Sequence, residues 1–266
     1  MSLTASVLAY NQSHLLPDCA HSIERQPYVT EQLIIDNGSE TPIHPHQYPG
    51  WTIKRVPLNV GNVMGQNLAF ESAISDWVLF VANDVRLLPN CVEELWKTKE
   101  LLEETTKKVG QIQPVLYKVD GSIDQAGMKW VWPGYGLSMT SCPNQPFKKV
   151  QIVPSTCYLM KKSVWNKIWF FDSSLGSSHE DVDMGIRLNR LGYSNYVAPG
   201  AKAIHLVNQT LKHTVKNPRE QFQYGRLKVL MKHYRGIDYW TRKLAVQALY
   251  GVTKKSPEIV TCRRRM

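Results

Sequence analysis

Long apolar runs, close cysteine pairs and repeats are all missing from this 266-residue sequence. No segment approaches the roughly 20 consecutive apolar residues that a membrane-spanning helix needs, and the N-terminus lacks the basic-then-apolar order of a secretory signal. Neither internal repeats nor low-complexity segments are present, and the composition is that of an ordinary globular protein. We therefore expect a cytoplasmic location.

Cysteine is also scarce. The five cysteines are odd in number and widely scattered, and no two of them form a C-x-x-C pair: Cys19, Cys91, Cys142, Cys157 and Cys262. Disulfide frameworks and zinc sites usually show paired or regularly spaced cysteines. The pattern predicts free thiols and no zinc site.

What the sequence does have is enough apolar material, 43% of its residues, for one large core or two modest ones. We expect one compact α/β domain over 1–210, with a basic helical extension over 211–266 packed on it. The net charge of +10 is compatible with nucleic acid, an anionic membrane surface or a phosphorylated small molecule. The basic C-terminal residues, Arg263, Arg264 and Arg265 among them, equally fit a solvated helix face and a frayed tail.

The first 110 residues alternate strand-like and helix-like patterns, which is typical of a parallel sheet wound with helices. Strands are expected at residues 3–9, 32–35, 51–56, 77–81, 109–114, 151–160 and 193–198. Helices are expected at residues 15–23, 66–75, 91–102 and 180–191, and beyond 217, where Phe222, Leu227, Leu230 and Met231 form an apolar stripe. The segment 116–149, rich in Gly, Pro, Trp and Tyr, is expected to be an irregular surface loop.

Acidic residues stand at the ends of three expected elements. Asp36 follows the apolar residues 33–35, and Asp84 comes soon after the apolar segment 79–82. A third acidic group opens the helix that begins near residue 180. Ligands bind beyond the carboxyl ends of strands in open α/β sheets, so these carboxylates predict one assembled site, suited to Mg²⁺ or Mn²⁺ beside a phosphate. Each motif taken alone also fits a turn or a helix start.

Five short motifs occur in a set order: Tyr10-Asn11 after the first strand, Asp36-Asn37-Gly38-Ser39, Asn59-Val60-Gly61 through Asn67, Asn83-Asp84-Val85, and Glu180-Asp181-Val182-Asp183. In this order and spacing they resemble the family-2 inverting glycosyltransferases of the GT-A fold, over roughly residues 3–206. The Asn-Asp-Val form is most similar to the rhamnosyltransferase-like branch. The resemblance implies a Rossmann-like wound, mostly parallel mixed sheet flanked by helices, with a C-terminal helical appendage.

The same resemblance implies a site for the nucleotide diphosphate of a sugar donor. Its nucleotide-binding residues would be Tyr10, Asn11, Asp36, Asn37, Asn59, Gly61, Asn67 and Asn83. Its metal ligands would be Asp84 and His205, holding Mn²⁺ or Mg²⁺. Ala82 stands where many members have the first Asp of the metal motif, which puts tight metal binding in doubt. One carboxylate with phosphate oxygens and waters still suits Mg²⁺.

For catalysis, the resemblance makes Asp181 the base that deprotonates the acceptor hydroxyl, beside Glu180. Neighbouring like charges raise the proton affinity of such a base, whereas a helix N-terminus favours the anion. The sugar or acceptor pocket would be shaped by Trp130, Trp132, Tyr135 and Thr156, with the segments 124–127 and 155–157 at its border. Aromatic faces stack well on the apolar faces of sugar rings.

The implied donor is a UDP-, dTDP- or GDP-linked sugar, and the implied acceptor is a hydroxyl of a glycan, a glycoprotein or a lipid-linked saccharide. Basic C-terminal helices would add a peripheral contact with the inner face of a membrane, and no nucleic acid partner is expected. Two alternatives stay open. A sugar-nucleotide pyrophosphorylase would need a Gly-rich basic loop after the first strand, where this chain has residues 10–13, Tyr-Asn-Gln-Ser. A non-catalytic carbohydrate- or nucleic-acid-binding module would fit the +10 charge and Ala82.

Overall fold

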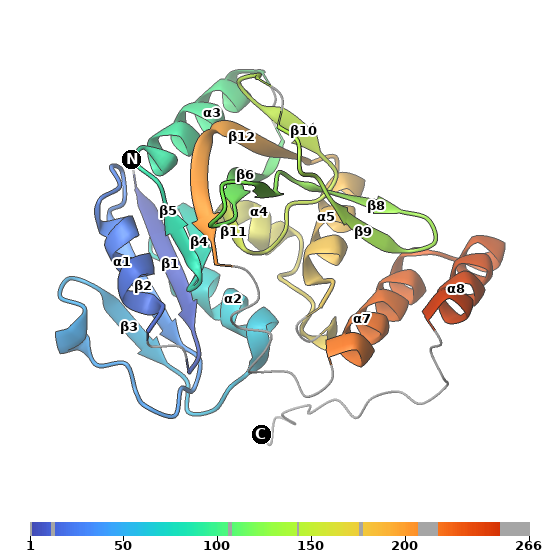
Figure 1. The fold of residues 1–266 in the computed structure, drawn as a ribbon, viewed down its shortest axis with the longest axis horizontal. Helices are drawn as coiled ribbons and strands as arrows, with labels where there is room; N and C mark the ends of the chain where they lie inside the picture. Colours follow the sequence, from blue (N-terminus) through green and yellow to red (C-terminus); the bar gives the residue numbers. More distant parts are fainter. Residues whose placement is uncertain are drawn as a thin grey trace.

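The fold is organised around one large mixed sheet (Figure 1). The computed structural model describes residues 2–11, 14–105, 108–142, 144–175, 178–206 and 218–250. Its strands are β1 Leu3–Ala9, β2 Glu31–Asp36, β3 Thr52–Arg55, β4 Trp77–Ala82, β5 Val85–Leu87, β6 Val109–Tyr117, β7 Ile123–Gln125, β8 Met128–Val131, β9 Tyr135–Ser138, β10 Lys148–Val150, β11 Cys157–Lys161 and β12 Ser194–His205. The helices are α1 Leu16–Glu24, η1 Pro45–Gln47, α2 Gly61–Ser72, α3 Cys91–Thr105, α4 Lys162–Lys167, η2 Ser173–Leu175, α5 Glu180–Arg190, α7 Pro218–His233 and α8 Gly236–Tyr250.

The strand order is β10-β12-β6-β11-β4-β1-β2-β3, with β5 paired to β12 and β7 to β6. β1 pairs in parallel with both β2 and β4, β2 with β3, and β6 with β12. β11 runs antiparallel to both β4 and β6, so β4, β6 and β12 all point the same way. The expected wound, mostly parallel mixed sheet is confirmed, and its parallel strands end at one common edge.

Helices cover both faces of the sheet, so each face builds its own core. On one face, α1 and α3 pack against β1, β4 and β6, with Leu16, Ile23 and Leu95 at most 1% exposed. On the other face, α2, α4 and α5 pack through a second cluster that includes the stacked rings of Phe70 and Trp165. Strands buried on both faces read as continuous apolar runs, and this explains why their positions were visible in the sequence.

Three expected elements differ most from their bounds in the structure. The helix expected at 66–75 begins at Gly61, because the Asn59 side chain accepts the Gly61 amide at 2.8 Å and starts the helix early. The strand expected at 151–160 begins only at Cys157, since Ile152 bridges to Met128 instead. The strand expected at 193–198 continues to His205 across a bulge.

The segment expected to be irregular, 116–149, contains four short strands, β7 to β10. Three or four residues are too few to show an alternating pattern, and this is why sequence reasoning missed them. β8 and β9 form a separate two-stranded sheet. Figure 1 shows this hairpin reaching toward α7.

The C-terminal helices pack on the sheet domain through a third apolar cluster. Trp130 of β8, Val182 of α5, Leu230 of α7 and Val246 of α8 are all buried in it. The expected stripe on α7 is only partly right, because Phe222 and Met231 are 43% and 59% exposed. The division at residue 210 stays a prediction, since residues 207–217 lie outside the described ones.

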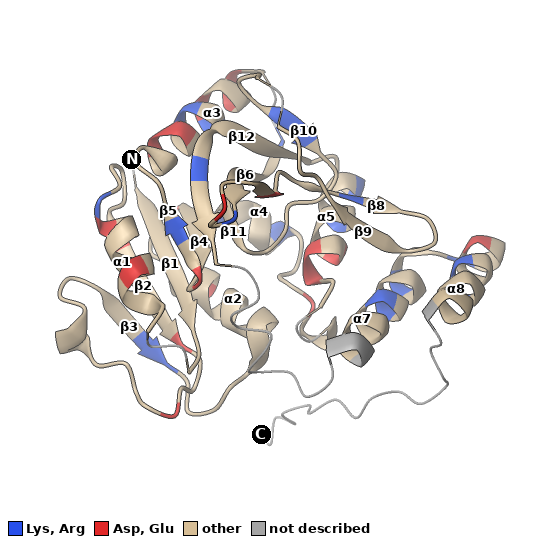
Figure 2. Cartoon of the chain, viewed as in Figure 1, with Lys and Arg blue, Asp and Glu red and all other residues tan. Residues whose placement is uncertain are grey.

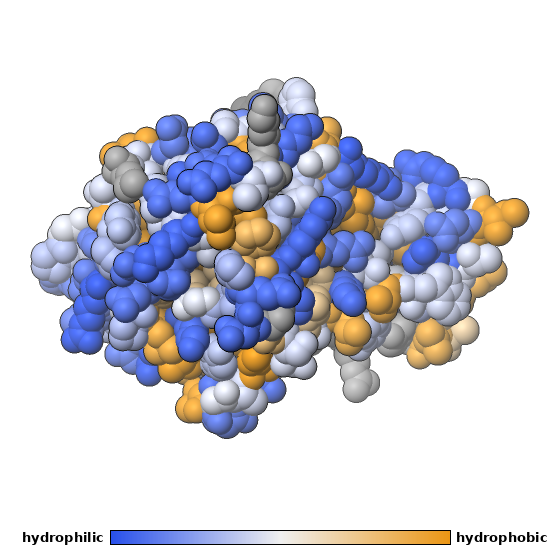
Figure 3. All heavy atoms as spheres, turned by 90° about the horizontal axis from the view of Figure 1, so that it is seen from above, coloured by the Kyte–Doolittle hydropathy of each residue, from blue (hydrophilic) through white to orange (hydrophobic). Residues whose placement is uncertain are grey.

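Figure 3 shows a mostly hydrophilic face with apolar residues at its right-hand end, where α8 lies in Figure 1. Over the described ranges, no helix combines the length and the apolar character that crossing a membrane would require. The four described cysteines, Cys19, Cys91, Cys142 and Cys157, are free thiols. Cys262 and the arginines at 263–265 lie outside the described residues.

Candidate donor-binding and catalytic site

The parallel strands deliver the predicted residues to one edge of the sheet. Tyr10 and Asn11 follow β1, Asp36 ends β2, Asp84 follows β4, and His205 ends β12. Because these strands run in the same direction, their carboxyl ends border the crevice in which ligands bind in this kind of sheet. Two of the three acidic motifs, those with Asp36 and Asp84, therefore lie at the same edge of the sheet.

Asp36 is completely buried, and both of its oxygens are occupied by neighbours. Oδ1 accepts the Ser39 amide at 3.0 Å, while Oδ2 accepts the Ile43 amide at 3.2 Å and pairs with the guanidinium of Arg55. Burial alone would raise the pKa of Asp36, but these hydrogen bonds outweigh it and lower the pKa below its usual value. In this structure Asp36 holds the loop 37–43, and a contact with the nucleotide stays a prediction.

Two asparagines tie that loop to the start of α2. Asn37 Nδ2 donates to Asn59 Oδ1 at 3.1 Å, and Asn37 Oδ1 accepts the Val60 amide at 3.0 Å. Gly38 has φ +75°, and a Cβ there would lie 2.6 Å from the Asn59 nitrogen. Only glycine fits this close approach of two loops. The sequence motifs at 36–39 and 59–61 thus form one continuous wall.

Asn11 extends the same wall. Its backbone takes the left-handed conformation, with φ 51°, its amide donates to Ser39 Oγ at 3.1 Å, and its side-chain oxygen accepts the Glu40 amide at 2.7 Å. Tyr10 beside it is partly buried, and Asn83 is buried next to Asp84. These contacts make the loops after β1 and β2 a single rigid unit.

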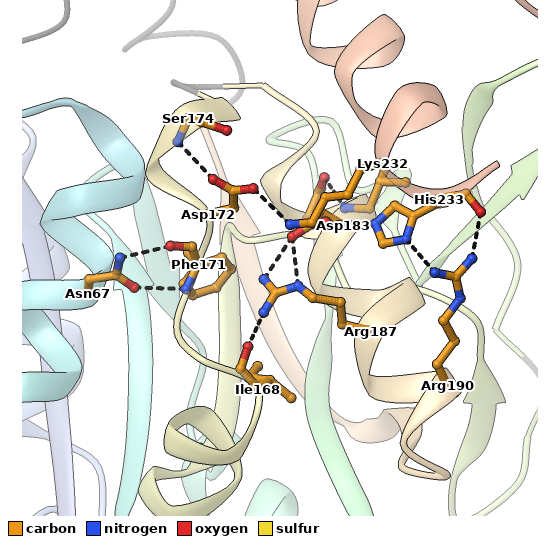
Figure 4. A network of polar contacts seen from close by, with 12 residues as sticks. Asn67, Ile168, Phe171, Asp172, Ser174, Asp183, Arg187, Arg190, Lys232 and His233 are labelled. Atoms are coloured by element: carbon orange, nitrogen blue, oxygen red, sulfur yellow. Dashed lines mark hydrogen bonds and ion pairs between the residues drawn. The ribbon is translucent and has the colours of Figure 1, made fainter. Parts of the chain in front are cut away.

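Asn67 is buried and its side-chain amide already has two backbone partners, so its assignment to the nucleotide site stays a prediction. Its amide group forms a matched pair with the backbone of Phe171, donating to the carbonyl and accepting from the amide, both at 3.0 Å (Figure 4). An amide occupied at both ends by backbone has a structural role, which here joins α2 to the segment before η2.

The predicted metal ligands meet at the edge of the sheet. His205 Nε2 lies 3.6 Å from Asp84 Oδ2, and its Nδ1 lies 2.8 Å from Asp124 Oδ2. Burial lowers the pKa of His205, but the two carboxylates outweigh it and raise the pKa to about 9. A carboxylate that orients a histidine from behind is the usual second partner of a metal-ligating imidazole. Within the described ranges, no group of three or more His, Cys, Asp or Glu side chains is gathered closely enough to hold a metal without other ligands.

Glu180, the first residue of α5, contacts both the start of α2 and the segment just before β11. Its Oε1 accepts the Ser155 hydroxyl at 2.7 Å and the Asn62 side chain at 3.0 Å. Asn62 lies in the first turn of α2, and Ser155 precedes Thr156, whose carbonyl bonds to the end of β4. Burial raises the pKa of Glu180. This residue therefore connects the start of α2, after the Asn59–Gly61 loop, to the start of α5.

Asp181 is only partly buried, and its environment sets it apart from the other carboxylates. Burial and the like charge of Glu180 raise its pKa to about 7, although the Val182 amide, which donates to Oδ1 at 2.7 Å, works in the other direction. A carboxylate with a pKa near neutrality is well matched to general base catalysis. The role of Asp181 as the catalytic base stays a prediction that this raised pKa favours.

The aromatic residues predicted for the sugar or acceptor pocket differ in how exposed their side chains are. Trp130 is buried and stands edge-on to His179, with ring centroids 5.8 Å apart, whereas Trp132 is 60% exposed. Tyr135, 41% exposed, has the guanidinium of Arg226 over its ring at 5.2 Å. The hairpin β8–β9 and α7 thus stand together beside the N-terminus of α5.

Sequence reasoning missed several residues that shape the site. Arg55 lies in no motif, and Asn62 and His179 lie in the motifs at 59–67 and 179–183 without having been singled out as site residues. His179 has φ 64°, its Nδ1 lies 2.6 Å from the Ser178 hydroxyl, and burial with the nearby Arg226 charge lowers its pKa to about 3. The left-handed backbone of His179 is visible only in the structure, so the sequence offered no signal for it beyond its place before the acidic pair.

The fold and this edge of the sheet together define a GT-A glycosyltransferase fold. The chain belongs to glycosyl transferase family 2, whose family model matches residues 4–169. This agrees with the resemblance seen in the sequence motifs, including its rhamnosyltransferase-like character. Membership of the family does not favour the alternatives of a pyrophosphorylase or a non-catalytic binding module.

The sequence is similar to the N-acetylglucosaminyl-diphospho-decaprenol L-rhamnosyltransferase of Mycobacterium tuberculosis, with 24% identity over 178 residues. The aligned part is 59% of this chain and 54% of the relative, so the chain spans about half the length of the curated relatives it matches.

Solved structures share the fold at low sequence identity. GalNAc-T7, crystallised with UDP, GalNAc and Mn²⁺, superposes with a TM-score of 0.70 at 12% identity, covering 93% of this chain and 51% of that one. A mannosyltransferase from Pyrobaculum calidifontis in complex with GDP-Man and Mn²⁺ gives 0.61 at 14% identity, covering 94% and 70%. TarS from S. aureus, residues 1–349, gives 0.60 at 13% identity, covering 94% and 72%.

Proposed function

We propose that this chain transfers a sugar from a nucleotide-diphosphate sugar to an acceptor hydroxyl with inversion of the anomeric configuration. The observation that carries the proposal is Asp181, a partly exposed carboxylate with a pKa of about 7 at the start of a helix beside the sheet edge. A base of this strength accepts a hydroxyl proton at neutral pH and releases it again between turnovers.

In the proposed reaction, Asp181 takes the proton of the acceptor hydroxyl as its oxygen attacks the anomeric carbon. The bond from that carbon to the nucleotide diphosphate breaks on the opposite face, so one in-line displacement inverts the configuration. Glu180 stays bound to Ser155 and Asn62, and it therefore orients Asp181 and raises its proton affinity without needing to accept a proton itself.

The residues at the sheet edge fit a divalent ion. Asp84 offers a carboxylate and His205 an imidazole whose other nitrogen is held by Asp124, and oxygen with nitrogen donors suits Mn²⁺ as well as Mg²⁺. When bound beside the donor, such an ion would neutralise charge on the leaving diphosphate. The structural neighbours crystallised with Mn²⁺ and a nucleotide or a nucleotide sugar support this expectation.

The donor nucleotide would lie along the wall formed by Asn11, Asn37 and Asn59. This wall is fixed by bonds between its own loops before any ligand arrives, which lowers the entropy cost of binding. We leave UDP, dTDP and GDP as candidate nucleotides, and a hexose or rhamnose as the candidate sugar, the latter because of the rhamnosyltransferase relative.

We further propose a glycan or lipid-linked acceptor, with peripheral contact of α8 on an anionic membrane. Ile237, Trp240 and Leu244 recur at helical spacing on α8 and are 83%, 55% and 62% exposed. α8 itself carries the basic residues Arg242 and Lys243 and one acidic residue, Asp238. An apolar stripe flanked by basic residues is typical of a helix that lies in a membrane interface.

The direct test of the proposed activity is a panel of UDP-, dTDP- and GDP-linked sugars with the pure protein and Mn²⁺ or Mg²⁺. Binding of the correct donor should raise the melting temperature, since a ligand at 100 times its dissociation constant adds about 2.7 kcal/mol of stability. The product's anomeric coupling constant, measured by NMR, then tests inversion. Retained configuration would refute the mechanism, and no binding by any nucleotide sugar would refute the function.

A further inference from the structure

The first turn of α5 is held by a buried network that the proposed reaction does not use. Asp183, two residues after the proposed base, is completely buried. Its Oδ2 accepts Arg187 Nε at 2.8 Å, and its Oδ1 lies 2.7 Å from His233 Nε2 and 2.8 Å from Lys232 Nζ (Figure 4). Arg187 belongs to α5 itself, whereas His233 and Lys232 end α7. One carboxylate therefore joins the catalytic helix to the C-terminal helix.

The contacts of His233 fix which of its nitrogens carries the proton. Arg190 Nη1 lies 2.9 Å from His233 Nδ1, and a guanidinium can only donate. Nδ1 must therefore accept, and Nε2 carries the hydrogen that it donates to Asp183. Arg190 also bonds the His233 carbonyl at 2.7 Å. His233 thus contacts α5 at two points, Asp183 and Arg190.

Lys232 extends the network to the segment before α5. Its ammonium lies 2.8 Å from both Asp172 and Asp183, so a single charge bridges two carboxylates. The buried, hydrogen-bonded setting keeps Asp183 ionised: burial would raise its pKa, but His233, Arg187 and Lys232 lower it to about 2. Figure 2 shows the acidic start of α5 beside the basic residues of α7.

In its N-terminal half, α7 also lies against the residues just before α5. A Cβ on Gly225 would lie 2.7 Å from the Ser178 carbonyl oxygen and 3.1 Å from His179 Nδ1. Phe222 stands edge-on to His179, with ring centroids 5.8 Å apart. α7 therefore touches α5 on both sides of Asp181: at His179, which precedes it, and at Asp183, which follows it.

We propose that α7 acts as a clamp that sets the position of the general base, with His233 and Lys232 as positioning residues for Asp181. This inference rests on the proposed function. The proton transfer requires Asp181 to lie within hydrogen-bond reach of the acceptor hydroxyl, and misplacement by 1 Å can cost about 100-fold in rate. The nucleotide wall, built from the loops after β1 and β2, shares none of these contacts.

The test compares variants of the clamp in the full chain. His233→Ala removes the donor to Asp183, whereas His233→Gln keeps an N–H at nearly the same reach. Lys232→Met removes the bridging charge from a partly exposed site, so it remains informative if His233→Ala folds poorly. Lys228→Met is the matched control, because Lys228 lies one turn earlier on α7 and donates to the Ser174 carbonyl instead.

We expect His233→Ala and Lys232→Met to lower kcat about 10- to 100-fold while donor dissociation constants, measured by calorimetry, change less than about twofold. His233→Gln should recover most of kcat, and Lys228→Met should retain it. Hydrogen exchange at the amides of residues 180–190 should become faster in the two disruptive variants. A merely stabilising contact would leave kcat of the folded protein unchanged.

Three results would overturn the clamp. They are full kcat in a variant whose α5 amides exchange faster, unchanged exchange in both disruptive variants, and a parallel loss of donor binding and kcat that His233→Gln does not restore. Failure of the proposed function looks different: the unmodified chain would turn over no nucleotide sugar at all. The hydrogen-exchange measurement does not depend on enzymatic activity, so it still tests whether α7 holds α5 in place.

Discussion

Replacing Asp181 by Asn tests the proposed base most directly. The amide has nearly the shape of the carboxylate but cannot accept a hydroxyl proton. General base catalysis typically contributes about 10²- to 10⁴-fold, so kcat should fall by at least about 100-fold with donor affinity almost unchanged. Glu180→Gln should be milder, because Glu180 is already bound to Ser155 and Asn62.

The raised pKa of Asp181 gives this prediction a pH signature. Only the ionised carboxylate acts as a base, and its pKa is about 7. Below that value kcat/KM for the acceptor should fall about tenfold per pH unit, and above it the rate should level off. In Asp181→Asn the residual rate should lose this inflection. An inflection that persists unchanged in the variant would show that another group is the base.

Stability should change in the opposite direction from activity. The pKa of Asp181 rises from 3.8 to about 7 on folding, so the folded state binds more protons and loses stability as pH rises from about 4 to about 7. The full shift corresponds to about 4 kcal/mol, which solvent screening of this partly exposed group reduces to roughly 1–2 kcal/mol.

Asp181→Asn should therefore melt roughly 3–6 °C higher than the unmodified chain at pH 8, with almost no difference at pH 4. Scanning calorimetry at both pH values measures this. A variant that is less stable at pH 8 would refute the reasoning that burial and the charge of Glu180 disfavour the ionised Asp181 carboxylate in the folded state.

Three further changes probe the rest of the site. Asp84→Asn should weaken Mn²⁺-dependent binding of the donor diphosphate and leave the fold intact, as titration calorimetry can measure; unchanged metal dependence would move the ligand role to His205. Asp36→Ala should raise KM for the donor more than it lowers kcat in steady-state assays, and a fall in kcat alone would mean that Asp36 is misassigned. Gly38→Ala should destabilise the chain by about 1–3 kcal/mol in urea unfolding, because φ +75° and the nearby Asn59 backbone exclude a side chain; an unchanged midpoint would contradict this.

The sequence predicted the parts of the fold that depend on local pattern. Buried strands such as 77–82 are continuous apolar runs, and the acidic residues at their ends follow from where those runs stop. Residues 116–149 were not predictable in the same way, because each of their strands has only three or four residues. β7 pairs with the preceding β6 and β8 with β9, whereas β10 pairs with the distant β12. Strands this short leave no periodic signal.

The same limit applies to the site. Asp181 was identified from its motif, but the residues that hold Asp183 lie about 50 positions later in the chain, in a helix whose pattern indicated only an apolar stripe. Asn67 was assigned to the nucleotide because it ends a motif, whereas its partner is the backbone of Phe171, 104 positions away. Any residue can supply a backbone amide and carbonyl, so a hydrogen bond to the backbone cannot be predicted from a sequence motif.

Arg55 also affects the edge of the sheet, because it lies on the outermost strand β3. The strand order ends at β3 on one side and at β10 on the other. An outermost strand leaves backbone groups free to pair with another molecule, and natural sheets discourage this with short, charged edge strands. β3 carries Lys54 and Arg55, and β10 carries Lys148 and Lys149. Exchanging Arg55 for an apolar residue would thus leave Asp36 with only its donors at Ser39 and Ile43, and it would also make one edge of the sheet more prone to aggregation. Lost activity in such a variant must therefore be separated from aggregation before it is assigned to a damaged nucleotide pocket.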